Sequence, residues 1–105
     1  MKKILLSVLA MGAMSVSAYA ACSGATCANV KVTKLYMTAG GTMYVGTDGT
    51  EANLDCGGIS GVYMSLAEGN VGKNAMYSLL LTAQTTNKSV TIRTAPDCSI
   101  AYITN

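Results

Sequence analysis

The segment VGKNAMYSLLLTAQTTNKSVTIRT, residues 71–94, contains the change of pattern that decides the fold. Its first part has apolar residues at helical spacing and predicts a helix from about Val71 to Thr86. The residues expected to face the core are Met76, Leu79, Leu80 and Ala83. Asn70 and Asn87 suit the two ends of this helix as caps. Immediately afterwards, residues 89–94 alternate between polar and apolar, with Val90 and Ile92 inward, which is typical of a strand.

Upstream of the helix, the stretch NVKVTKLYMT (29–38) is rich in β-forming residues, but its apolar phase slips between Val32 and Leu35. A slip of one residue indicates a bulge, which bends a strand sharply. The alternating stretch TMYVGT (42–47) follows as the partner strand.

Two loops could join these strands. A two-residue loop over Gly40 and Gly41 would pair Met37 with Tyr44, whereas a three-residue loop that adds Ala39 pairs Met37 with Met43. The longer loop is favoured because it keeps one apolar face intact, and a slipped register would turn every side chain over. It sets Tyr36 opposite Tyr44 on the outer face.

The remaining segments complete a recognisable order. ANLDC (52–56) is expected to be a short third strand, VYMSL (62–66) a short extended piece, and CSIAYIT (98–104) the last strand. Three strands, a helix and two strands are the order of an OB-fold, a five-stranded barrel with its helix between strands three and four. Strand five runs beside strand three in that barrel, which would place Cys56 and Cys98 on neighbouring strands.

The first twenty residues, MKKILLSVLAMGAMSVSAYA, have the features of a secretory signal peptide. Two lysines precede a short apolar run, and Ala18-Tyr19-Ala20 is a cleavage site of the A-x-A type. The alternative is a lipoprotein signal with Cys22 acylated, but Tyr19 stands where a leucine is usual. The sequence therefore predicts an exported protein, periplasmic or secreted, with no membrane attachment after cleavage and one domain over residues 21–105.

Charge excludes one class of partner. Without Lys2 and Lys3 of the signal peptide, the mature domain has five basic and five acidic residues, so its net charge is zero. A neutral surface has no electrostatic attraction for DNA, RNA or anionic lipid. We therefore expect no nucleic-acid partner.

All four cysteines lie in the mature part, where an oxidising compartment favours disulfides in so small a domain. Cys22 and Cys27 are near enough in CSGATC to pair locally, which leaves Cys56 with Cys98. A zinc site is the alternative use of the four thiols. It would need all of them because the chain has no histidine, and the C-x4-C spacing has no second copy.

Catalytic patterns are mostly missing, and neither an enzyme nor a cofactor is expected. The absence of histidine removes catalytic triads and the commonest general base. Asp48, Glu51 and Asp55 are close in sequence but do not have the spacing of a calcium loop, so they are expected to be solvated turn residues. CGGISGV (56–62) lacks the lysine and the following helix of a phosphate loop.

The run YSLLLTAQTTNKSVTIRTAPDCSIAYI (77–103) resembles part of a group of small exported bacterial proteins of unknown function. Over residues 30–103, the layout of a helix, a K-x-V-x-I strand and a cysteine-bearing strand is also similar, more distantly, to the OB-fold B subunits of pertussis-like toxins and subtilase cytotoxin. In those toxins the B subunits form pentameric rings that bind cell-surface glycans. The resemblance therefore implies the same fold for this chain, with glycan binding as a hypothesis. The toxins' glycan contacts have no matching position here, and their cysteines join strands two and three.

Two functions follow as hypotheses. The first is a non-catalytic binding module for a glycan or another ligand, with Tyr36, Tyr44 and Arg93 on one outer face of the barrel, because aromatic rings suit sugar faces. The second is an oligomeric, protein-interaction or inhibitor protein of the cell envelope. Its candidate interface is Tyr77 with Leu81, which are four residues apart on the helix and turned away from the core stripe.

Overall fold

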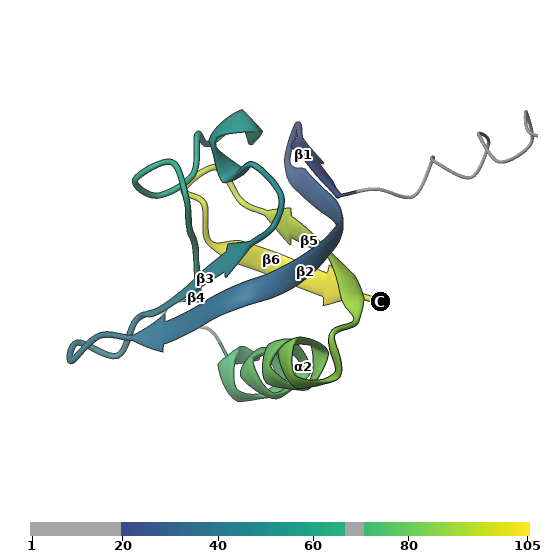
Figure 1. Cartoon of the computed structure of the whole chain (residues 1–105). Coiled ribbons are helices and arrows are strands. Elements are labelled where there is room, and N and C mark those ends of the chain that lie inside the picture. The colour runs from purple at the N-terminus through teal and green to yellow at the C-terminus, as the bar shows by residue number, and fades with distance from the viewer. Residues whose placement is uncertain (1–19, 67–70) are drawn as a thin grey trace, which may run out of the picture.

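The computed structural model describes residues 20–66 and 71–105 and has a mainly β fold with one helix (Figure 1). Apart from Ala20, the expected signal peptide lies outside the described residues, as does Asn70, the expected helix cap. The strands are β1 (Ala21–Ser23), β2 (Thr26–Met37), β3 (Met43–Thr47), β4 (Met64–Leu66), β5 (Ser89–Thr94) and β6 (Ile100–Thr104). The helices are the 3-10 helix η2 (Glu51–Asn53) and α2 (Lys73–Thr86).

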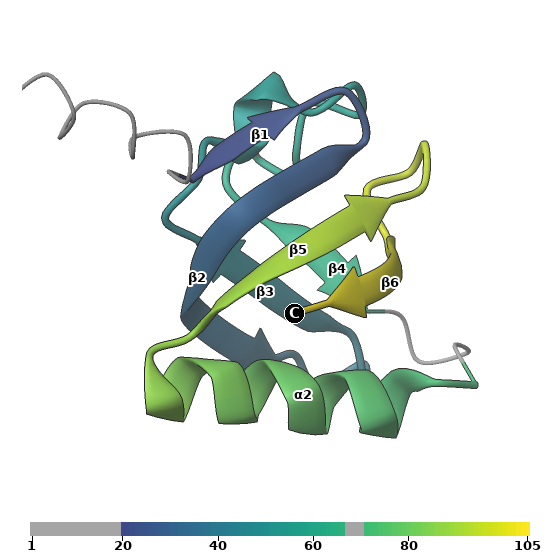
Figure 2. The same ribbon diagram turned by 90° about the vertical axis from the view of Figure 1, so that its right-hand side faces the viewer.

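The strands form one antiparallel sheet in the order β4-β3-β2-β5-β6, with β1 paired to the first part of β2. The sheet curves strongly, and α2 lies across one end of it (Figures 1 and 2). The two ends of the sheet approach each other at a single parallel bridge between Ser65 and Ser99, where the Ser65 amide donates to the Cys98 carbonyl at 3.0 Å. One bridge does not make a ladder, so the six-stranded sheet is unclosed, and the expected five-stranded OB barrel is not confirmed.

The predicted hairpin register between β2 and β3 is confirmed. Met37 pairs with Met43, and Tyr36 pairs with Tyr44. The predicted bulge is also present, because Val32 and Lys34 pair with consecutive residues of β3 and leave Thr33 as the extra residue. The bulge reconciles the two apolar phases, so that both halves of the curved strand turn apolar side chains toward the core.

The prediction of a strand over 52–56 is wrong. Glu51–Asn53 form η2, and the Leu54 amide donates to the Glu51 carbonyl at 3.0 Å. The next amides are used in turns as well, since Gly57 donates to the Leu54 carbonyl and Asp55 to the Gly24 carbonyl, each at 2.7 Å, so no strand ladder forms. β4 takes the place of the expected third strand, at the edge beside β3.

The Cys22–Cys27 disulfide is present, but not in the expected surroundings. Its cysteines are directly paired residues of the β1–β2 hairpin, and both are buried in the core. The turn after β3 packs tightly on this hairpin: a Cβ added to Gly49 would lie 2.8 Å from the Cys22 sulfur. The bridge therefore belongs to the folded core, within strands that begin before the first strand predicted from the sequence, at residues 29–38.

The Cys56–Cys98 disulfide is also present, as predicted. It joins two turns, however, and not two neighbouring strands. Cys56 follows η2, while Cys98 lies in the turn before β6 with a left-handed φ of 68°. In that turn the Cys98 amide donates to the Ala95 carbonyl at 2.9 Å, and Asp97 accepts from the Ser99 amide at 3.0 Å. This disulfide fixes the loop after β3 to the β5–β6 turn.

The helix packs on the sheet through the predicted stripe. Leu80 and Ala83 are buried, while Met76 is partly buried against the same core. Asn87 ends the helix in the left-handed conformation that was expected, with φ 57°. The N-cap is Gly72, so the helix begins two residues later than predicted. Of the helices in the described ranges, neither has the length and apolar character needed to cross a membrane.

Candidate functional site

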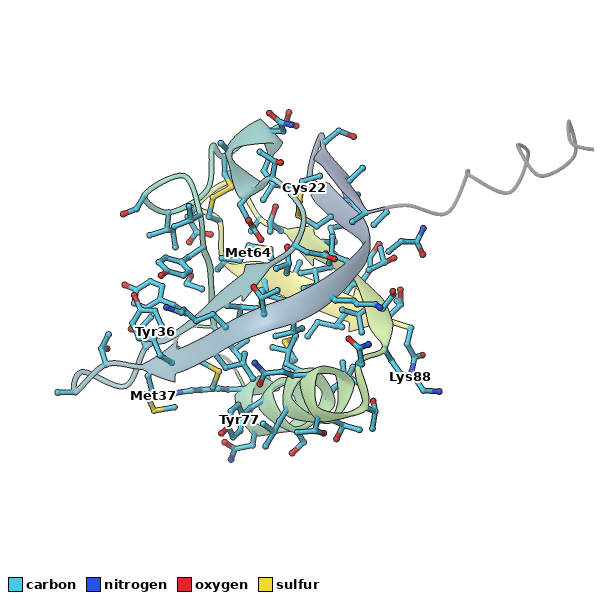
Figure 3. The ribbon with its side chains drawn as sticks, in the orientation of Figure 1. Cys22, Tyr36, Met37, Met64, Tyr77 and Lys88 are labelled. Carbon is cyan, nitrogen blue, oxygen red and sulfur yellow. A yellow bond between two sulfur atoms is a disulfide. The ribbon has the colours of Figure 1, made fainter. Side chains whose placement is uncertain are left out.

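Three tyrosine rings gather on the outer face of β2 and β3. Tyr36 and Tyr44, paired across the strands, have ring centroids 5.3 Å apart. Tyr63 joins them, with its centroid 5.4 Å from Tyr36 in an edge-on contact and 6.0 Å from Tyr44. Tyr36 remains 42% exposed, and Figure 3 shows it on the outside of the molecule beside the end of β2. This tyrosine cluster gives a small domain an aromatic surface assembled from three chain segments.

Tyr63 is positioned by a tight turn and by a glycine. The turn is closed by backbone hydrogen bonds in both directions between Ile59 and Tyr63, at 2.7 and 3.0 Å. The Tyr63 ring then lies over Gly46 of β3, where an added Cβ would be 3.4 Å from the ring. Sequence reasoning missed Tyr63. The available signal was the alternation of Met64 and Leu66 in the sequence. Both are buried, and alternation along a strand places the residue next to Met64 on the outer face.

A polar pocket of about 360 Å³ adjoins the tyrosine cluster at Tyr63. Its lining is dominated by hydroxyl, glycine and charged residues, and an aromatic ring forms one wall. The residues that carry its chemistry are Thr33, Lys34, Thr47, Thr50, Glu51 and Tyr63. We refer to it as the Tyr63 pocket. It combines one aromatic side chain with several hydrogen-bonding groups.

Glu51 is the unexpected member of this pocket, because the sequence suggested a solvated turn residue. It is only 3% exposed. Its Oε2 accepts hydrogen bonds from the Thr47 amide at 2.9 Å and from the Thr47 hydroxyl. These bonds compensate the loss of water around a buried carboxylate. Asp48 and Asp55, by contrast, are both exposed, as expected for turn residues.

Glu51 also lies beside the N-terminal disulfide. Its carboxylate and the sulfurs of Cys22 and Cys27 lie within 4.8 Å of one another. Both sulfurs are joined in a disulfide, so neither is a thiolate available to a metal ion. This group is therefore explained by core packing and needs no metal.

Arg93 does not join the tyrosines. It pairs with Thr26 at the start of β2, whereas Tyr36 lies ten residues further along that strand. Arg93 instead lines a separate pocket of about 260 Å³, together with Asp55 and Cys56. The ligand face expected from sequence is thus divided into two places, because β2 is long and bent and its two ends meet different partners.

The candidate interface on the helix lies near the tyrosine cluster. Tyr77 and Leu81 are 38% and 39% exposed, as expected for residues turned away from the core. Tyr77 lines a cleft of about 150 Å³ with Tyr36 and Met37, and the three labelled side chains lie on the same side of the molecule in Figure 3. The two surfaces that the sequence suggested separately are therefore neighbours.

The tyrosine cluster raises the pKa of Tyr36 above its ordinary value. Partial desolvation is the first cause, and the nearby Tyr63 and Tyr44 oxygens add to it. A raised pKa means that the folded protein favours the neutral phenol. The resulting stabilisation is present below the ordinary tyrosine pKa and is lost as the pH rises through the folded value.

Tyr36→Phe is therefore expected to lose less stability than the wild type when the solution is made alkaline. Urea unfolding of the wild type and the variant should be compared at about pH 9 and again above about pH 10, where tyrosine ionises. The difference between the two conditions should be smaller for Tyr36→Phe. Tyr102→Phe provides the control, because Tyr102 is an exposed residue of β6. Equal alkaline losses for the wild type and Tyr36→Phe would contradict the expectation.

No family model, curated protein or solved structure matches this chain. The resemblance to exported bacterial proteins and toxin B subunits remains an expectation from sequence. The chemistry of the tyrosine cluster and its pocket is what supports a function.

Proposed function

We propose that the protein is an exported, non-catalytic binding module that holds a glycan on the tyrosine cluster and in the Tyr63 pocket. The two disulfides are typical of proteins that fold in an oxidising compartment, which supports export. The strand order, with its ends bridged at Ser65 and Ser99, supports a barrel of the OB type as the scaffold.

The observation that carries the proposal is the meeting of three tyrosine rings with a polar pocket at Tyr63. A sugar ring has an apolar C–H face and an edge of hydroxyl groups. The aromatic surface fits the former, because tyrosine buries a large apolar area at low entropic cost. The threonine hydroxyls, Lys34 and Glu51 supply donors and acceptors for the latter.

The test is a glycan array probed with residues 21–105 carrying both disulfides, followed by affinity measurements on the sugars that bind. Tyr63→Ala should weaken binding at least tenfold, which corresponds to about 1.4 kcal/mol. Tyr102→Ala is the matched control, because Tyr102 is 50% exposed on β6, away from the cluster. Thermal unfolding of each variant verifies that it is folded. An empty array, or binding that Tyr63→Ala leaves unchanged, would refute the proposal.

The alternative is a protein-interaction or self-assembling protein of the cell envelope. It is favoured by the exposure of Met37 and Tyr77, which line one cleft, and of Leu81, four residues after Tyr77 on the same helix. Light scattering of the same preparation distinguishes the two functions. An empty array together with an oligomer that Leu81→Glu disperses would support assembly instead of glycan binding.

A further inference from the structure

The buried carboxylate of Glu51 has one oxygen occupied and one oxygen free. Both hydrogen bonds from Thr47 go to Oε2. Among residues 20–66 and 71–105, no hydrogen bond reaches Oε1, and no side-chain oxygen there is both fully enclosed and without a partner. Oε1 therefore keeps some accessible surface, and Glu51 is one of the residues that line the Tyr63 pocket. A carboxylate held rigidly by one oxygen presents the other as a fixed acceptor.

The charges of the pocket restrict what that acceptor can bind. Lys34 is the one cation in its lining, and its side chain is exposed, where water screens its charge. A carboxylated sugar would bring a second anion close to the buried Glu51, and like charges in a partly enclosed space repel. A hydroxyl group, in contrast, donates to a carboxylate in a strong, charge-assisted hydrogen bond.

We infer that the ligand of the Tyr63 pocket is an uncharged sugar unit, a hexose or an N-acetylhexosamine, that donates one hydroxyl hydrogen bond to Oε1 of Glu51. This inference rests on the proposed function. The Tyr63 ring contacts the face of the sugar, and Glu51 accepts a hydrogen bond from a hydroxyl group at the edge of the sugar ring. Selectivity among neutral sugars then depends on which hydroxyl can reach Oε1 while the ring remains against Tyr63.

The test combines one substitution with altered ligands. Glu51→Gln keeps the side-chain shape and retains an oxygen that can accept from Thr47, but it presents an amide donor in place of the free acceptor. Calorimetry with the best uncharged sugar of the array should show at least a tenfold loss of affinity. Asp55→Asn, which removes the same charge from an exposed acid outside this pocket, should bind like the wild type.

Monodeoxy analogues of that sugar identify the hydroxyl. One analogue should bind the wild type at least tenfold more weakly than the parent sugar does, and Glu51→Gln should bind this analogue and the parent equally. Binding that requires a carboxylated sugar, or that Glu51→Gln does not weaken, would overturn the inference. If Tyr63→Ala abolishes that binding, the proposed glycan function still holds, although the inference about Glu51 fails.

Two further outcomes separate folding from recognition. If Glu51→Gln does not fold, the affinities of the wild type for the monodeoxy analogues decide the question. The inference fails if no analogue binds the wild type at least tenfold more weakly than the parent sugar does. If the array is empty, the proposed function fails and the inference fails with it.

Discussion

Cys56→Ala is expected to leave the mature domain unfolded or open to proteases under conditions in which the wild type is folded. The Cys56–Cys98 bridge spans 42 residues of sequence, and closing a loop of that length stabilises a fold by about 4 kcal/mol in the chain-entropy model. A domain of this size has roughly 4–13 kcal/mol of stability in total, at 0.05–0.15 kcal/mol per residue. The expected loss is therefore between about a third and all of the stability of the domain.

Urea unfolding and limited proteolysis of Cys56→Ala/Cys98→Ala measure this loss without a free thiol. The control is Cys22→Ala/Cys27→Ala, whose short loop contributes about 2 kcal/mol by the same model. Because Cys22 and Cys27 are buried in the core, that control should also lose some packing energy, so it will not be silent. A wild-type unfolding midpoint for the Cys56 and Cys98 double variant would contradict the expectation.

Leu80→Ala should be the most damaging single change in the helix. Leu80 has no exposed surface, and besides Leu80 only Ala83 is buried among the residues of α2. Truncating a fully buried leucine typically costs about 2–5 kcal/mol, from lost burial and from the cavity left behind. We expect the helix to lose its protection from hydrogen exchange before the sheet does, since this side chain attaches it to the core.

Leu81→Ala is the matched control for this prediction. It makes the same substitution one residue later, at a position that is 39% exposed, and the same helix propensity applies. Chemical denaturation should show a change of about 1 kcal/mol or less, because little apolar area is removed from the core. Equal destabilisation by the two substitutions would mean that α2 does not dock through Leu80.

Features set by neighbouring residues could be predicted from the sequence. The register of the β2–β3 hairpin followed from keeping Met37 and Met43 on one apolar face, and the bulge followed from the slip in phase. The helix stripe and its left-handed end at Asn87 were also local signals. The disulfide pairs followed from the separations of the four cysteines, which made one pair local and left the other.

Features set by distant contacts could not be predicted. The segment 52–56 was expected to be a strand, whereas backbone hydrogen bonds within its own turn and to Gly24 decide its path. Glu51 is buried because Thr47 satisfies it, and no spacing rule reveals that. Arg93 and Tyr36 were placed together because their strands were expected to be neighbours in a barrel, whereas Arg93 pairs with Thr26, ten residues before Tyr36 on β2.

The arrangement of the two disulfides has a consequence for the order of pairing during oxidative folding. Cys22 and Cys27 are five residues apart in a hairpin, a structure that can close in microseconds, whereas Cys56 and Cys98 are 42 residues apart. Four free cysteines allow three pairings, but once the first bond has formed, Cys56 has a single partner to wait for. When the Cys22–Cys27 bond forms first, it therefore excludes both wrong pairings, and the only bond left to form is Cys56–Cys98.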